Sequence, residues 1–254
     1  MLKLAEKENL EAILRFCDGD LLGTRIGCYC LSYGFNYDFL NIWIDETEVG
    51  IQTVIAKFYD TITVKTSAES FDEIKDFVNM IGFNTLEMYQ SDCEKSGFIP
   101  DEIKKAYIFD GVAENLGALS LYEEHLRDVY DLVSRNIPGS FSDSKEAYLS
   151  FISDFTFKSR RNFARCKGVL IDSKPVSSAI TAAETHSCAL ISAVASDSNL
   201  RGKGLGKTTV LTMVDELINE GKKAFVVALN ESAQGFYEKL GFKYFNDIAI
   251  VRQN

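Results

Sequence analysis

Seven residues with alternating glycines are the part of this sequence best suited to bind a charged ligand. They lie between an apolar, strand-like run at 189–195 and a helix-like run at 208–220, and they read Arg201, Gly202, Lys203, Gly204, Leu205, Gly206 and Lys207. Glycines let backbone N–H groups approach an anion closely, and the helix that follows adds unpaired amides and the positive end of its dipole. With three basic side chains at the same place, the stretch predicts a phosphate-binding loop.

The glycine spacing of this loop can be compared with the spacings of known phosphate-binding loops. A Walker A loop needs a glycine where Arg201 stands, and the following strand, 224–229, lacks the acid that helps to hold magnesium. The dinucleotide fingerprint has the spacing G-x-G-x-x-G, and Asn230 replaces the acid expected after the next strand. The pyrophosphate of coenzyme A remains as a ligand, and a glycine-rich turn that binds nothing remains as the alternative.

Two segments resemble sequence motifs of the GNAT superfamily of acyl-CoA N-acyltransferases. Residues 194–206, VASDSNLRGKGLG, are similar to its motif A, and residues 230–242, NESAQGFYEKLGF, are similar to its motif B. The two come in the family's order with a helix and a strand between them, and the resemblance covers about residues 121–254. Ser198 stands where many members carry proline, which is a mild change in a turn.

The resemblance implies where acetyl-CoA, the expected co-substrate, would bind. The pyrophosphate would lie on the 201–207 loop, and the pantetheine arm would pair like an added strand with the backbone of Val194, Ala195 and Ser196. A bulge near Ala195 would open the sheet for the arm and free a backbone N–H to stabilise the oxyanion, an effect of roughly 3 kcal/mol. The Asn230 amide would either bond the arm or cap the helix that follows it.

Tyr237 is the expected catalytic side chain. The resemblance implies a general acid that protonates the departing thiolate, and a phenol with an ordinary pKa near 10 stays protonated at neutral pH. The alternative is a ring that packs beneath the cofactor. No acid lies on 187–196, Glu184 and His186 are expected at a hairpin turn, and Asp197 follows the segment that pairs with the arm, so we expect a water relay to remove the proton of the acceptor.

Composition excludes several other classes of protein. The first 20 residues lack the basic and apolar regions of a secretory signal, and no apolar run reaches the roughly 18 residues of a membrane span. The six cysteines form no C-x-x-C pair, and with only two histidines there is no metal-binding spacing. We therefore expect a cytoplasmic protein with reduced thiols and no metal.

Charge divides the chain into two parts. Residues 1–112 contain 20 acidic and 10 basic residues, whereas 113–254 contain 17 of each, so the net charge of −10 belongs to the first part. An acidic first part disfavours nucleic acid and anionic membranes as partners. The change in charge between the two parts predicts two domains, 1–112 and 113–254. Glycines near 110–116 interrupt the secondary-structure pattern at this boundary.

Hydrophobic periodicity predicts an α+β fold throughout. For the C-terminal domain we expect a GNAT-type mixed, mostly antiparallel sheet flanked by helices, with helices at 122–136, 143–158, 207–220 and 232–240 and strands at 162–171, 175–184, 187–196, 224–229 and 243–252. The N-terminal domain is expected to contain helices at 3–17 and 70–82 and strands at 25–33, 39–45, 51–58, 61–66, 84–90 and 105–109. It is either a degenerate GNAT-like unit or an unrelated α+β domain.

Together these expectations describe an N-acetyltransferase that moves an acetyl group from acetyl-CoA directly to an amine, on either a small molecule or a peptide. The alternative is an acyl-CoA-binding regulatory protein without catalytic activity. The sequence does not identify the acceptor, the role of the N-terminal domain or the oligomeric state.

Overall fold

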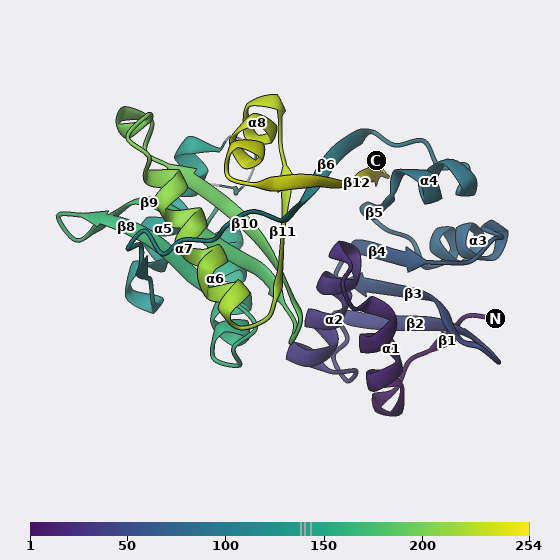
Figure 1. Cartoon of the computed structure of the whole chain (residues 1–254). Helices are drawn as coiled ribbons and strands as arrows, with labels where there is room; N and C mark the ends of the chain where they lie inside the picture. The colour runs from purple at the N-terminus through teal and green to yellow at the C-terminus, as the bar shows by residue number, and fades with distance from the viewer. Residues whose placement is uncertain (138, 140, 143, 254) are drawn as a thin grey trace. The chain divides into compact units, whose positions relative to one another are not determined.

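The computed structural model describes residues 1–137, 139, 141–142 and 144–253 (Figure 1). Contacts within the chain define two compact units. The first contains residues 1–107, 227–235 and 244–254, and the second contains 108–226 and 236–243. This division differs from the predicted one chiefly because two C-terminal segments belong to the first unit. That residues 113–254 fold as a domain of their own remains a prediction.

The same order of elements, β-α-α-β-β-β-α-β-α-β, occurs twice along the chain. Its first copy consists of β1 (Lys3–Leu4), α1 (Leu10–Cys17), α2 (Leu21–Tyr33), β2 (Leu40–Thr47), β3 (Gly50–Phe58), β4 (Thr61–Thr66), α3 (Asp72–Ile81), β5 (Thr85–Tyr89), α4 (Gln90–Ser96) and β6 (Glu102–Phe109). Its second copy consists of β7 (Leu119–Ser120), α5 (Leu126–Asn136), α6 (Lys145–Ser159), β8 (Cys166–Ile171), β9 (Lys174–Glu184), β10 (Cys188–Ser196), α7 (Leu205–Asn219), β11 (Lys223–Ala228), α8 (Glu231–Lys239) and β12 (Phe242–Arg252). The chain is therefore a structural repeat.

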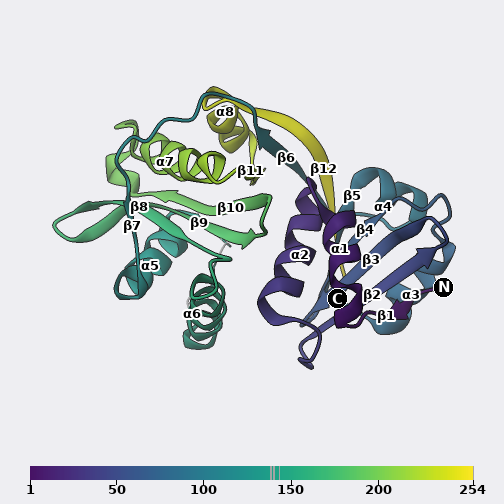
Figure 2. The same ribbon diagram turned by 60° about the horizontal axis from the view of Figure 1, so that its bottom comes forward.

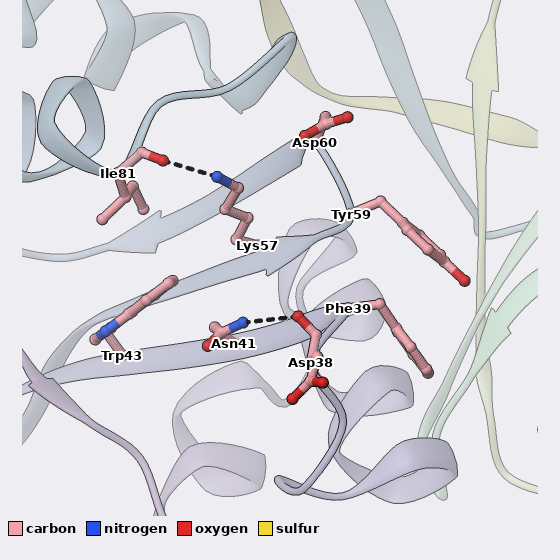
Figure 3. Close-up of a pocket in the computed structure, with 8 residues that line it drawn as sticks. All are labelled: Asp38, Phe39, Asn41, Trp43, Lys57, Tyr59, Asp60 and Ile81. Carbon is pink, nitrogen blue, oxygen red and sulfur yellow. Dashed lines mark hydrogen bonds between the residues drawn. The ribbon is translucent and has the colours of Figure 1, made fainter.

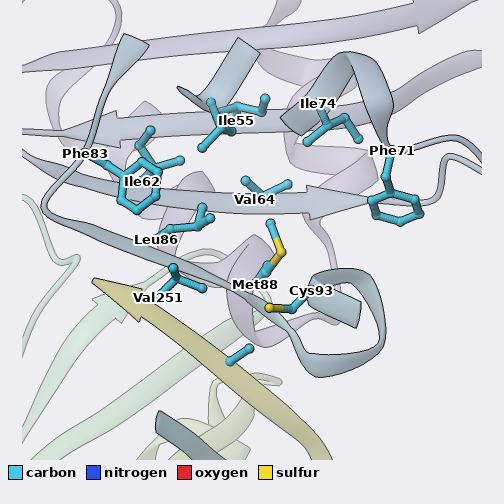
Figure 4. Close-up of a cluster of buried hydrophobic side chains, with 12 residues drawn as sticks. Ile55, Ile62, Val64, Phe71, Ile74, Phe83, Leu86, Met88, Cys93 and Val251 are labelled. Atoms are coloured by element: carbon cyan, nitrogen blue, oxygen red, sulfur yellow. The ribbon is translucent and has the colours of Figure 1, made fainter. Parts of the chain in front are cut away.

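In the first unit the strands have the order β1-β2-β3-β4-β5-β12-β6. The β4–β5 pair is parallel, and the pairs β1–β2, β2–β3, β3–β4 and β5–β12 are antiparallel. Helices α1 and α2 cover one face, and α3 and α4 cover the other, where Ile55, Ile62 and Leu86 form the centre of a buried cluster (Figure 4). Val251 of β12 belongs to that cluster, so the last strand of the chain contributes to this core.

One predicted strand of this unit is wrong. Residues 25–33 lie in helix α2, which begins after Asp20, whose carboxylate accepts a hydrogen bond from the Gly23 N–H at 2.7 Å. Nine of its 13 residues are buried, so the helix lacks the polar stripe that marks a surface helix, and a buried apolar run has no clear period. Gly23 is required for close packing, because a Cβ there would lie 2.2 Å from the Cys17 carbonyl oxygen.

In the second unit the strands have the order β11-β10-β9-β8-β7, with a parallel pair between β10 and β11 and antiparallel pairs elsewhere. Helix α7 covers one face of this sheet, and α5 and α6 cover the other (Figure 2). Residue 143, where the predicted helix 143–158 began, lies outside the described residues. No helix in the described part of the chain combines the length and apolar character needed to cross a membrane.

Candidate active site

The glycine loop leads into the first turn of α7. Gly202 and Gly204 both have φ +80°, a conformation that favours glycine, and Gly204 is the N-cap residue of the helix. A Cβ at either position would meet nothing within 4 Å, so the loop is open on its outer side. Arg201, Lys203 and Lys207 are exposed, and no carboxylate among the described residues pairs with them. The loop therefore offers helix N–H groups and three uncompensated cations to an anion.

The third glycine of the loop serves close packing. A Cβ at Gly206 would lie 3.3 Å from the Ser196 Oγ and 3.4 Å from a ring carbon of Phe236. The start of α7, the end of β10 and helix α8 thus meet at this position. The fold brings motif A and the aromatic part of motif B together here.

Strand β10 is interrupted beside the loop. Its pairing with β9 shifts register between Ser192 and Ala195, and Ala193 has φ +49°. Its parallel pairing with β11 covers Cys188–Ile191, although β10 continues to Ser196. The bulge expected near Ala195 is therefore present, and over the described residues the backbone of 192–196 has no β11 partner. This is an edge to which an extended ligand can add.

A short 3₁₀ turn, Ser198–Leu200, joins β10 to the loop. The Asp197 carboxylate caps it by accepting a hydrogen bond from the Asn199 N–H at 2.9 Å. The Ser198 N–H donates to the Asn136 Oδ1 of α5 at 2.9 Å. A proline has no N–H and could not make this hydrogen bond. Serine at position 198, in place of the proline of many family members, therefore connects the turn to α5.

Tyr237 lies on α8 with 7% of its surface exposed. Its ring contacts Phe236 and Phe242, with centroids 5.3 and 5.5 Å apart. Burial raises the pKa of the phenol above its ordinary value near 10, which keeps the hydroxyl protonated. Among the described residues the hydroxyl has no hydrogen-bond partner, so its proton is not committed elsewhere. Both expected roles, acid and packing surface, suit this position, and its catalytic role remains a prediction.

Asn230 caps helix α8. Its Oδ1 accepts a hydrogen bond from the Ala233 N–H at 3.0 Å, so the capping alternative is realised. The Nδ2 group makes no hydrogen bond within the described residues and can still donate to a ligand. The contact with the pantetheine arm remains a prediction.

Neither Glu184 nor His186 is placed to act as a base. Glu184 is fully buried and bonds Arg165, Lys222 and Thr181 through its two oxygens. Glu184 pairs in register with Ala189 of β10. Ala189 comes seven residues before Ser196, a separation of about 23 Å along an extended strand, so Glu184 lies far from the segment proposed to bind the arm. His186 is exposed in the turn after β9, where it contacts Phe163. The expected water relay is untested.

A hollow lies in the first unit, on the side of its sheet near the end of α3 (Figure 3). It measures about 520 Å³ and is lined by Asp38, Phe39, Asn41, Trp43, Lys57, Tyr59, Asp60 and Ile81. The ammonium group of Lys57 donates to the Ile81 carbonyl at 2.7 Å, and the lining also contains the carboxylates of Asp38 and Asp60. This hollow does not suit a phosphate. Trp43 packs against Phe77 and also lines the hollow.

Over the described residues, no group of three or more His, Cys, Asp or Glu side chains could hold a metal ion. All six cysteines are buried free thiols.

Comparisons with known proteins identify a family for the C-terminal part of the chain and relatives of its fold. The family model for the acetyltransferase (GNAT) family matches residues 126–242. A tandem GNAT protein from the clavulanic acid biosynthesis pathway is similar in structure, with a TM-score of 0.63, 11% identity, and 98% of this chain and 97% of that chain covered. No curated protein has a significant sequence match to this chain.

Two further structures are similar over the whole chain. A GNAT-family acetyltransferase from Colwellia psychrerythraea has a TM-score of 0.60 and 10% identity, with 100% of both chains covered. A GCN5-related N-acetyltransferase from Sphaerobacter thermophilus has a TM-score of 0.60 and 12% identity, with 100% of this chain and 95% of that chain covered.

Such low identities show the fold alone. In this chain that fold is a tandem one, because the elements from β1 to β6 repeat the order of those from β7 to β12. The family assignment depends on the family model and on the two motifs that the fold brings together. The C-terminal part of this chain, residues 126–242, is a domain of the acetyltransferase (GNAT) family.

Proposed function

We propose that this protein transfers an acetyl group from acetyl-CoA directly to an amine carried by a small molecule or a peptide. The observation that supports this most is the start of α7, beside the interrupted strand β10. Two positive-φ glycines lie there with three cations that pair with no carboxylate in the described part of the chain. Six buried free thiols suit a reducing compartment, and we propose the cytoplasm.

The proposed reaction uses few side chains. The pyrophosphate binds the 201–207 loop, and the pantetheine arm pairs with the backbone of 194–196. The ammonium group of the acceptor loses one proton to a water relay, and the neutral amine attacks the thioester carbon. A C–N bond forms, the C–S bond breaks, and the nitrogen gives its second proton to water, which can return a proton to Tyr237. A backbone N–H at the β10 bulge stabilises the oxyanion, and the Tyr237 hydroxyl gives its proton to the leaving thiolate.

Turnover tests this proposal. Purified protein is supplied with acetyl-CoA and a panel of amines, and the released thiol is measured against a control without amine. Amine-dependent thiol release supports the transferase. CoA binding without turnover by any amine class would instead favour the regulatory alternative, and no CoA binding at all would reject both.

Substitution of Gly204 by valine tests the loop. A side chain there would enter the space open to the pyrophosphate, so we expect the affinity for CoA to fall at least about tenfold, a cost of roughly 1.4 kcal/mol. Gly221 gives a matched control at the other end of α7, because its φ is +76° and a Cβ there also meets nothing within 4 Å. Gly221→Val should carry the same backbone strain and keep CoA affinity, as measured by calorimetric titration. Equal affinities of the two variants would remove the loop from the site.

We expect one CoA per chain despite the structural repeat. In the first copy the segment between β4 and α3, Ser67–Phe71, contains no glycine, and α3 begins with Asp72 and Glu73, which repel an anion. Lys65, which precedes this segment, pairs with Asp20 at 3.0 Å. Calorimetry should therefore give a stoichiometry near one. Two equivalent sites, or a second site whose affinity for CoA is the same in wild type and in the folded Gly204→Val variant, would contradict this.

A further inference from the structure

Three hydroxyl groups from three different elements meet beneath the glycine loop. Ser177 lies on β9, Ser196 ends β10, and Thr209 lies one turn into α7. Ser177 and Thr209 are fully buried, and Ser196 is half-buried. We call this group the hydroxyl cluster.

The Ser177 hydroxyl is the centre of the cluster. Its Oγ donates to the Ala195 carbonyl at 3.1 Å and accepts from the hydroxyls of Ser196 at 3.1 Å and Thr209 at 2.9 Å. A serine hydroxyl has one donor and two acceptor positions, so all three are used. Buried hydrogen bonds of this kind are costly to break, since the partners stay desolvated.

The cluster joins the two parts of the proposed cofactor site. Ser177 and Ser196 are register partners, and Ala195 precedes Ser196 in the segment proposed to pair with the pantetheine arm. The Thr209 Oγ1 also lies 3.0 Å from the Leu205 carbonyl oxygen, in the first turn of α7. The end of β10 is thus connected through Ser177 to the helix that carries the phosphate loop.

We propose that Ser177 is a positioning residue whose hydroxyl fixes the separation between the arm-pairing backbone of β10 and the phosphate loop. This inference rests on the proposed function. A ligand that must contact both parts at once binds best when their spacing is set before it arrives, because the cost of ordering them is then not taken from the binding energy. A ligand that contacts one part only is indifferent to that spacing.

The adjacent residue provides a matched control. Ser178 is as fully buried as Ser177, and its Oγ has no hydrogen-bond partner within the described residues. Ser177→Ala and Ser178→Ala therefore delete the same atom from neighbouring buried positions. Only the first deletion disconnects the cluster.

The experiment compares CoA with its two halves, pantetheine and 3′-phosphoadenosine 5′-diphosphate, by calorimetric titration or by competition. We expect Ser177→Ala to raise the Kd for CoA about tenfold. Its Kd for each half should stay within about twofold of wild type, as should all three values for Ser178→Ala. In turnover, Ser177→Ala should raise the KM for acetyl-CoA with little change in kcat at saturation, a split that general destabilisation does not produce.

A second pair of variants keeps the test independent of the folding of Ser177→Ala. Thr209→Val retains the shape and removes the hydroxyl, whereas Thr209→Ser retains the hydroxyl, so the first should weaken CoA binding and the second should preserve it. The inference is overturned if wild type binds CoA and neither Ser177→Ala nor Thr209→Val binds it more weakly than Ser178→Ala. It is equally overturned if CoA and its halves weaken together. Absence of CoA binding by wild type would overturn the proposed function as well.

Discussion

Replacing Tyr237 by phenylalanine should lower kcat by about 10²- to 10⁴-fold, the range that general-acid assistance contributes. The substitution keeps the ring between Phe236 and Phe242, so the packing of α8 and the affinity for CoA should hardly change. What is lost is the proton offered to the leaving thiolate, which must then depart unassisted or take a proton from water. Steady-state kinetics with an accepted amine, with CoA affinity measured separately, tests this.

The pH dependence of the rate gives a second readout for Tyr237. Burial raises the pKa of the phenol, so its deprotonation should limit kcat only at a pH above about 10, the ordinary value for tyrosine. In the phenylalanine variant that limb of the profile should disappear. Tyr122→Phe is the control, because that ring is 64% exposed and its hydroxyl can be deleted without touching the site. A near-normal kcat for Tyr237→Phe would leave Tyr237 a packing role only.

Much of the fold could be predicted because its strands and helices have clear periods. The predicted strands 39–45, 51–58 and 61–66 correspond to β2, β3 and β4, and the C-terminal strands agree to within a few residues. Helix α2 was missed because it is buried on nearly all sides and its sequence has no polar stripe. The pairing of β12 with β5, which adds the last strand of the chain to the first unit, was not predictable either. Strand periodicity does not identify the neighbours of a strand.

The conformation of the glycine loop was predictable from the sequence, whereas anion binding by the loop remains a prediction. Alternating glycines and a following helix predict an anion site from the chain itself, and the positive φ of Gly202 and Gly204 agrees with that. The role of Ser177 was not predictable, because a serine in a strand carries no signal of which hydroxyls it will meet. The contact of Asn136 was not predictable either, because its Oδ1 accepts a hydrogen bond from the N–H of Ser198, 62 residues later in the chain.

A network of ion pairs around the buried Glu184, at the far end of the C-terminal sheet, raises a separate question of stability. Arg165 makes two hydrogen bonds to Glu184 and two to Glu220, and Lys222 pairs with both acids. The Arg165 guanidinium lowers the pKa of Glu220 to about 2 from its ordinary 4.5. A depressed pKa means that the stabilisation by Glu220 is present above pH 4.5 and is lost as the pH falls toward 2. Chemical denaturation between those pH values should show this decline.

Replacing Glu184 by glutamine should destabilise the protein by about 3 kcal/mol, because it leaves Arg165 and Lys222 short of a buried countercharge. At roughly 2–4 °C per kcal/mol for a chain of this size, Tm should fall by about 6–12 °C. Glu123→Gln is the matched control, since Glu123 and its partner Arg160 are 54% and 67% exposed and such pairs contribute about 0–1 kcal/mol. Below the transition, Glu184→Gln should bind CoA like wild type, because Glu184 lies far along β9 from the phosphate loop. A loss no larger than that of Glu123→Gln would show that Glu220, which pairs with both cations, and Glu216, 3.6 Å from Arg165, suffice to compensate them.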